Sequence, residues 1–214
     1  MILVRKVFFS FILLGNVTTF YSQTKNDTLI IASITKLNEC DTKQDFKTIA
    51  GDFERIIYID EKNWLPYYYT AYSKVKLAYL SKGEDIDRYC DEAANYLKMA
   101  EKINPQNSEI YALYAYLYSV KVNVDPRIRG EVMGRKSADY INLSIKADPT
   151  NPRPYLIRAV GIYYTPKVFG GGEEKALPYL QKALEKFNTF VPRYEAMPSW
   201  GKIQAEQLLN NYKK

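Results

Sequence analysis

Asn107-Ser-Glu-Ile-Tyr111-Ala-Leu-Tyr-Ala115 is the stretch that decides the fold, because the chain repeats its pattern once before and once after. The Asn, Tyr and Ala positions recur 44 residues away on each side, at Asn63, Tyr67 and Ala71 and at Asn151, Tyr155 and Ala159. An aromatic residue followed four positions later by alanine lies on one face of a helix. Self-similarity at a fixed period is typical of stacked, equivalent helical units. We therefore expect an all-α solenoid.

Each unit continues with a second amphipathic helix. Its apolar stripe alternates small and large residues, as in Ala93, Leu97 and Ala100, then Ser137, Ile141 and Ser144, then Ala176, Leu180 and Ala183. Such a stripe suits two helices that cross closely. Pro105 and Pro149 follow the first two of these helices.

This pattern resembles the tetratricopeptide repeat, whose units carry W-x2-L-G-x2-Y, then A-x3-F, then a closing Pro. The three recurring Tyr take the Trp position and the recurring Ala take the Gly position. The chain departs from the pattern where Thr70, Tyr114 and Arg158 replace Leu, and where Asn188 replaces the third Pro. The resemblance implies a right-handed superhelix of helical hairpins that binds a partner, without catalysis and without a cofactor.

The units are longer than those of the family. Ala71 to Ala93 and Ala115 to Ser137 each span 22 residues and Ala159 to Ala176 spans 17, against roughly 12 in the family's regular spacing. We expect the excess to form an enlarged loop inside each unit. The expected organisation is a divergent leading helix pair over residues 23–62, three helix pairs over residues 63–197, and a C-terminal capping helix over residues 198–214 that includes Trp200.

Residues 1–22 have the features of a secretion signal. Arg5 and Lys6 precede an apolar run that ends at Leu14, and Ser22 is a small residue at the expected cut. The run is shorter than the roughly 20 residues that span a bilayer. A buried first helix is the alternative. We expect an exported protein, periplasmic or secreted, with no membrane span once the signal is removed.

Composition narrows the chemistry. The chain has 20 Tyr and no His, and the lack of histidine removes the commonest general base, the commonest metal ligand and every Ser-His or Cys-His triad. The formal net charge is +6, and no expected helix face concentrates it, so nucleic acid is not an expected partner. We expect neither a catalytic site nor a metal site.

Two smaller features have structural interpretations. Cys40 and Cys90, the only cysteines, fall in or next to the expected loops of neighbouring units, so a disulfide is one hypothesis and two unpaired thiols the other. The three glycines at residues 170–172 favour a left-handed turn over a phosphate cradle, because Glu173 and Glu174 follow them.

The family resemblance implies a concave groove lined by the first helices of the units. The matching positions are Tyr68, Tyr72, Lys76, Tyr116, Ser119, Arg153, Tyr163 and Tyr164. Tyrosine combines a large apolar face with a hydroxyl that stays wet, which suits recognition of a protein or peptide partner. Packing of helix against helix is the alternative role. Neither the partner's identity nor the oligomeric state follows from the sequence.

A narrower resemblance gives a second functional hypothesis. The stretch Tyr164-Thr-Pro-Lys-Val-Phe-Gly-Gly-Gly172 is similar to short exported tetratricopeptide proteins of Gram-negative envelopes, and to the tetratricopeptide components associated with TRAP transporters. That similarity implies a small-ligand-binding component of an uptake system, with its pocket under the enlarged loops.

Overall fold

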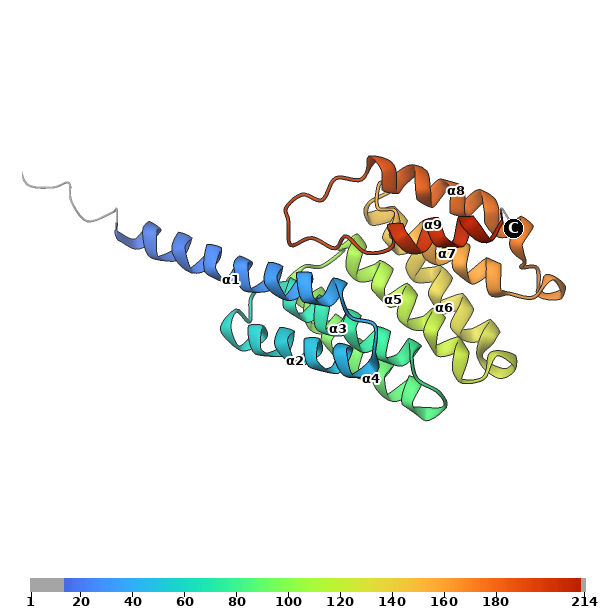
Figure 1. Cartoon of the computed structure of the whole chain (residues 1–214), viewed down its shortest axis with the longest axis horizontal. Helices are drawn as coiled ribbons and strands as arrows, with labels where there is room; N and C mark the ends of the chain where they lie inside the picture. The colour runs from blue at the N-terminus through green and yellow to red at the C-terminus, as the bar shows by residue number, and fades with distance from the viewer. Residues whose placement is uncertain (1–13, 213–214) are drawn as a thin grey trace, which may run out of the picture.

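The computed structural model describes residues 14–212 of the protein, with side chains described from residue 26 onward. All regular structure in this range is helical (Figure 1). The elements are α1 (Leu14–Asn38), α2 (Lys43–Ile59), α3 (Trp64–Tyr79), α4 (Glu84–Ile103), α5 (Ser108–Lys121), the 3-10 turn η1 (Val122–Val124), α6 (Pro126–Ala147), α7 (Arg153–Tyr164), the 3-10 turn η2 (Lys167–Phe169), α8 (Glu173–Thr189) and α9 (Lys202–Asn211).

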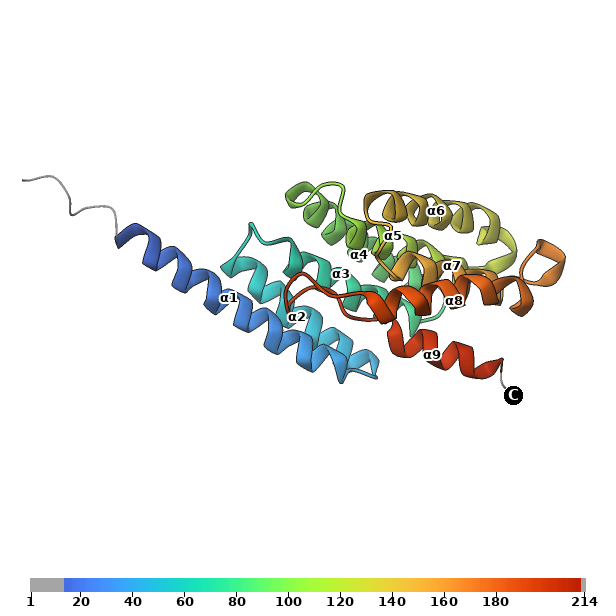
Figure 2. The same cartoon turned by 90° about the horizontal axis from the view of Figure 1, so that it is seen from above.

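Consecutive helices form antiparallel hairpins that stack side by side. The pairs α3 with α4, α5 with α6, and α7 with α8 follow one another along the molecule, and α5 packs between α3 and α7 (Figures 1 and 2). The expected all-α solenoid of helical hairpins is confirmed.

The recurring Asn is the N-cap of the first helix in two units. The Asn63 side chain accepts a hydrogen bond from the backbone N–H of Leu65 at 3.1 Å. The Asn107 side chain accepts from Glu109 N–H at 2.8 Å and from Ile110 N–H at 3.3 Å. A capping Asn satisfies backbone donors that have no partner within the helix. The period of 44 residues thus records where each unit starts its first helix.

The recurring Ala marks the helix crossing. Ala71, Ala115 and Ala159 are fully buried, and the Ser137 hydroxyl on α6 donates to the Ala115 carbonyl on α5 at 2.8 Å. Only a small residue on the facing helix lets a serine side chain approach a helix backbone this closely. The small-large-small stripe of the second helices serves the same close approach.

The leading helix pair consists of α1 and α2. Ile30 and Ile34 on α1 are buried with Phe46 and Phe53 on α2, and a reciprocal hydrogen-bond pair at Thr42 caps α2. The predicted signal lies outside the described residues over 1–13. From Leu14 onward α1 is one helix that continues through the predicted cut, so the first helix begins earlier than expected.

The excess residues of the first two units lie in helices and not in enlarged loops, which corrects the expectation. Only residues 80–83 separate α3 from α4, and η1 with Asp125 separates α5 from α6. The second helices are long instead, with 20 residues in α4 and 22 in α6. The sequence spacing counts residues but does not record whether they are helical.

The third unit has the one longer connection among these three, residues 165–172 between α7 and α8. Gly170 and Gly172 adopt φ angles of 83° and 107°, which side chains other than glycine avoid. Glu173 and Glu174 follow in the first turn of α8, where the helix dipole favours negative charge. The predicted left-handed turn is confirmed.

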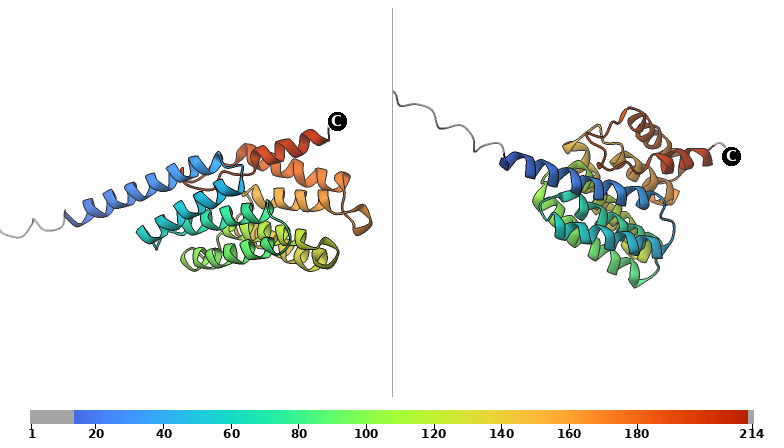
Figure 3. Two further views of the ribbon diagram at one scale, coloured as in Figure 1. Left: turned by 60° about the horizontal axis from the view of Figure 1, so that its bottom comes forward. Right: turned by 60° about the vertical axis from the view of Figure 1, so that its left-hand side comes forward.

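The segment between α8 and α9 is not helical and returns across the stack. We call residues 190–201 the strap; in Figures 1 and 3 it leaves α8, loops outward and comes back to start α9. Hydrogen bonds from Tyr69 to Ala196 and from Trp200 to Tyr68 join it to α3. The capping helix begins at Lys202 and not at Pro198. Gly201 has a φ angle of 108°, and a Cβ there would approach the Phe187 ring to 2.8 Å. The chain therefore turns into α9 at a position that requires glycine.

The buried apolar residues form two main clusters. The larger joins residues of α1 to α5 and includes Ala196 of the strap. The second joins α7, α8 and α9 through residues such as Leu156, Leu180 and Leu208. A small third cluster around Ala115 and Ile157 lies where α5, α6 and α7 meet, with Trp200 packed against it. None of the helices in the described range is long and apolar enough to cross a bilayer.

Candidate functional site

The strap covers part of the face that the sequence predicts as a partner groove. The Trp200 ring lies 5.3 Å from the ring of Tyr72 and 5.9 Å from that of Tyr116, centroid to centroid. Its Nε1–H donates to the Tyr68 hydroxyl at 2.8 Å. Tyr68 is fully buried, and burial raises the pKa of its phenol. Tyr68 therefore anchors the strap and has no surface left for a partner.

Two further side chains hold main-chain carbonyls of the strap. The Tyr69 hydroxyl donates to the Ala196 carbonyl at 2.9 Å, and Arg153 Nη2 donates to the Pro198 carbonyl. Phenols and guanidinium groups that bind backbone carbonyls are suited to an extended peptide. Here the bound peptide is a segment of the same chain.

A buried ion pair lies under the strap. Arg153 Nη1 is 2.7 Å from Glu109 Oε1, and the two side chains are 0% and 5% exposed. The Arg153 guanidinium also lies over the rings of Phe190 and Trp200, 5.1 and 5.3 Å from their centroids. Burial raises the pKa of Glu109 to about 7, although Arg153 opposes the shift. Arg153, predicted to line the groove, is instead an internal support for the strap.

Next to Trp200 lies a surface of aromatic rings with one ammonium. The Lys76 ammonium is 5.5 Å from the ring centroid of Phe46 and 5.8 Å from that of Tyr79, and Tyr79 is 55% exposed. The phenols of Tyr72 and Tyr79 act electrostatically on Tyr116, although burial is the main reason that its pKa is raised. We call Tyr72, Lys76, Tyr79, Tyr116 and Trp200 the aromatic face.

In the described part of the chain, the remaining predicted residues make no hydrogen bond, ion pair or ring contact with a side chain of this face. The Ser119 hydroxyl donates to the Tyr116 carbonyl of its own helix at 2.7 Å. The ring of Tyr163 contacts those of Tyr164 and, on α9, Tyr212, at 5.0 and 5.7 Å. Tyr163 and Tyr164 line a hollow of about 380 Å³ beside the 165–172 connection. The predicted set thus divides into strap anchors, the aromatic face and this separate hollow.

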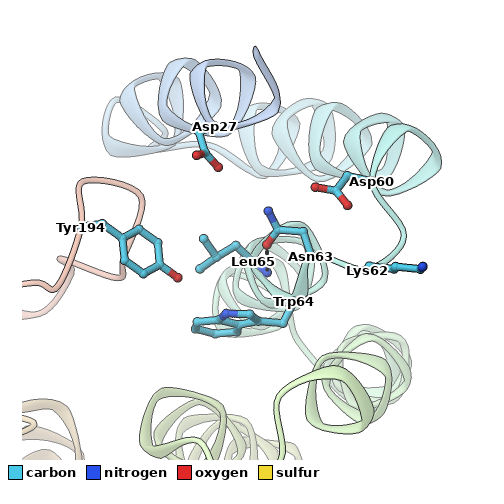
Figure 4. Close-up of a pocket in the computed structure, with 7 residues that line it drawn as sticks. All are labelled: Asp27, Asp60, Lys62, Asn63, Trp64, Leu65 and Tyr194. Atoms are coloured by element: carbon cyan, nitrogen blue, oxygen red, sulfur yellow. Dashed lines mark hydrogen bonds between the residues drawn. The ribbon is translucent and has the colours of Figure 1, made fainter. Parts of the chain in front are cut away.

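A further hollow of about 420 Å³ lies where α1, the α2–α3 turn and the strap meet. Figure 4 shows the carboxylates of Asp27 and Asp60 and the Tyr194 hydroxyl directed into it, with Trp64 along one wall. This hollow could not be predicted from the repeat pattern, because Asp27 and Tyr194 belong to parts of the chain outside the repeat register.

The two cysteines are unpaired, so the disulfide hypothesis is not supported and the alternative of free thiols holds. Cys90 lies inside α4 and not at the end of a loop. Its buried thiol is 3.8 Å from the Leu117 carbonyl, and burial raises its pKa to about 12. The Cys40 thiol contacts the Lys36 carbonyl at 3.4 Å. Within residues 14–212, no group of His, Cys, Asp and Glu is arranged to hold a metal ion.

Three residues central to this region were not assigned to it from the sequence: Tyr79, Glu109 and Trp200. Glu109 carried a usable signal, because Glu109 and Arg153 are 44 residues apart and occupy the same register position in neighbouring units. Opposite charges at equivalent positions of adjacent repeats can meet across the stack. Trp200 carried no such signal, since the strap does not repeat.

Comparison with known proteins places the chain in a family. No protein-family model and no curated protein matches it. Among solved structures, the HusA haemophore from Porphyromonas gingivalis superposes with a TM-score of 0.80 at 32% sequence identity, covering 88% of this chain and 92% of that chain. MamA aligns with a TM-score of 0.45 at 16% identity, over 77% of this chain and 79% of that one. The identity and near-complete coverage of the first comparison show that the chain belongs to the family of the HusA haemophore.

Proposed function

We propose that the protein is an exported, non-catalytic module that binds haem, or a closely similar planar aromatic ligand, on the aromatic face. The observation that carries the proposal is the 32% identity to a haemophore over 92% of that chain. The geometry supports it, because the rings of Tyr72 and Tyr116 lie against that of Trp200, and the exposed ring of Tyr79 follows Tyr72 on the same helix. Stacked aromatic pairs contribute about 0.5–1.5 kcal/mol each beyond the area that they bury.

The composition bears on how haem would be held. The chain has no His, the residue that most often binds haem iron from the protein side. Ligation by histidine is therefore excluded, and of the residues on this face only the tyrosine phenols could bind the iron. We expect contacts with the porphyrin ring to supply most of the affinity. A metal-free porphyrin should then bind about as well as haem.

Haem titration tests the proposal, with absorbance of the porphyrin and quenching of tryptophan fluorescence as readouts. We expect saturable binding with quenching, because Trp200 belongs to the face. Tyr79→Ala should weaken binding by about tenfold, equivalent to ~1.4 kcal/mol. Tyr58→Ala is the matched control, since Tyr58 is an 83% exposed tyrosine on α2 without a ring contact to the face. The absence of binding, or equal losses in the two variants, would contradict the proposal.

A protein or peptide partner is the second candidate function. It is favoured by the strap itself, in which Tyr69 and Arg153 bind a non-helical segment through its carbonyls. A partner peptide would have to displace residues 194–200, whereas a ligand on the exposed side of Tyr79 would not. This difference is why we place haem first.

Export is part of the proposal and has its own test. If residues 1–22 are a cleaved signal, the protein recovered from the periplasm or the medium should have the mass of a chain that begins at Gln23. A full-length chain confined to the cytoplasm would contradict export.

A further inference from the structure

Lys76 differs from Lys74 and Lys121, two other partly buried lysines of the stack, whereas Lys186 resembles it in having an aromatic neighbour and no ion pair among the described residues. Lys74, two residues earlier on α3, lies 2.8 Å from Glu92 and 3.5 Å from Glu54. Lys121 on α5 lies 2.6 Å from Asp91 and 3.6 Å from Asp87. Lys76 forms no ion pair with any residue in the described part of the chain. The ammonium groups of Lys74 and Lys121 thus have two carboxylate partners each, whereas that of Lys76 has none within this range and could pair with a carboxylate of a bound molecule.

The Lys76 side chain is half-buried, and the groups in contact with its ammonium are aromatic rings and not a carboxylate. Burial lowers the pKa of its ammonium, and the charge of Asp41 offsets only part of that shift. The rings of Phe46 and Tyr79 face the ammonium, and cation–π contacts of this kind offset part of the lost hydration. They do not supply the hydrogen-bond acceptors that the three N–H donors of an ammonium require. A carboxylate from a bound molecule would do so.

The Lys76 ammonium, which lacks hydrogen-bond acceptors among the described residues, lies beside the rings of the aromatic face. Lys76 follows Tyr72 by four residues, so the two side chains leave the same side of α3. Tyr79 contacts the ammonium, and its phenol acts electrostatically on Tyr116. A flat ligand stacked on these rings would have its edge at Lys76.

We propose that Lys76 is the specificity-determining residue of the aromatic face, and that it selects planar aromatic ligands that carry a carboxylate at their edge. The inference rests on the proposed function and names its ligand class. Lysine suits this role because it presents a compact point charge that does not require a bidentate geometry.

The test compares two probes with the same ring and a different charge at its edge: protoporphyrin IX, with two free carboxylates, and its uncharged dimethyl ester. Both are titrated, in the same cosolvent, into the full chain and into Lys76→Met, which keeps the aliphatic stem. Lys76→Arg restores the charge, and Lys98→Met, at an exposed position on α4, is the matched control. Circular dichroism and the melting temperature establish that each variant is folded.

We expect the wild-type chain to bind the acid at least about tenfold more tightly than the ester, which is the scale of one charge-assisted hydrogen bond. Lys76→Met should lose that preference by weakening the acid alone, Lys76→Arg should recover most of it, and Lys98→Met should keep it. Equal affinities of the wild type for acid and ester would overturn the inference and leave the proposed function standing. Equal losses for both probes in Lys76→Met would also overturn it, as a packing effect. Binding of neither probe would overturn both proposals.

Discussion

Glu109 and Arg153 are the two charges that the fold removes most completely from water. Burial of each charge costs several kcal/mol, and a close contact returns that cost only when the remaining polar atoms are also satisfied. Here Glu109 Oε2 and Arg153 Nε have no hydrogen-bond partner in the described part of the chain. The pair nevertheless fixes the strap, because the same guanidinium binds the Pro198 carbonyl.

The stability of the protein should therefore depend on the protonation of Glu109. Burial raises its pKa from 4.5 to about 7, so the folded state binds this proton more tightly than the unfolded state. The resulting stabilisation is fully present below pH 4.5 and is lost as the pH rises through 7, on the order of 3 kcal/mol in total.

Urea denaturation at pH 5, 6, 7 and 8 measures this effect. We expect the free energy of unfolding of the wild type to fall across the series relative to that of Glu109→Gln, which cannot titrate at this position. Parallel pH profiles for the two proteins would show that Glu109 does not titrate in this range.

Ala115 tests the repeat register. It is fully buried where α5 meets α6, and its carbonyl accepts from Ser137. Ala115→Leu should force the two helices apart, at a cost of ~1–3 kcal/mol for overpacking. That corresponds to a fall of roughly 2–12 °C in melting temperature for a domain of this size. Ala138→Leu, at an exposed position on α6, should change the melting temperature by little. Equal melting temperatures of the two variants would contradict the register.

Among the elements, those with the 44-residue period were predictable and the others were not. The period located the capping Asn, the crossing Ala and the two tyrosines that meet at Trp200. It could not place residues 190–201, which have no counterpart in the other units. The sequence suggested that Trp200 belongs to a helix, because an amphipathic pattern continues through it, whereas the turn at Gly201 separates it from α9.

The candidate site was only partly predictable for the same reason. Tyr72, Lys76 and Tyr116 were assigned from the family resemblance because they lie at regular positions on first helices. The family pattern contains no strap. Reasoning from it therefore could not distinguish exposed groove residues from residues that the strap covers. Tyr68 and Arg153 are buried in part because the strap, which is distant in sequence, packs over them.

The hydrogen bond between Trp200 and Tyr68 is the element-scale contact that can be isolated most cleanly. Trp200→Phe keeps an aromatic ring but leaves the buried Tyr68 hydroxyl without this partner, which should cost about 1–3 kcal/mol. Tyr68→Phe alone should also destabilise, because the Trp200 N–H loses its acceptor.

A double-mutant cycle measured by urea denaturation separates this bond from general packing. The double variant should lose less stability than the sum of the single variants, by about 0.5–3 kcal/mol. Additive losses would show that the two groups do not interact.

In the whole molecule, the strap is the exception to a nearest-neighbour architecture. Units of a repeat stack contact mainly adjacent units, so such proteins can open in parts. The strap instead joins distant positions: Tyr69 with Ala196 and Tyr68 with Trp200, 127 and 132 residues apart. It contributes Ala196 to the cluster of α1 to α5 and leads directly into α9, whose Ala205 belongs to the other main cluster.

The strap should therefore make the two clusters unfold together. Native-state hydrogen exchange measures the opening free energy of each helix, and in the wild type we expect similar values for α3 and α8, since opening of either end must release the strap. Trp200→Ala removes the ring that packs against Tyr72, Tyr116 and the small cluster between α5 and α7. In this variant α7, α8 and α9 should open at a lower free energy than α3 and α4. Tyr164 is 72% exposed at the far end of α7, so Tyr164→Ala should leave the opening free energies of α3 and α8 similar. If α3 and α8 still open at one common free energy in Trp200→Ala, the small cluster alone couples the halves and the strap serves only to shape the aromatic face.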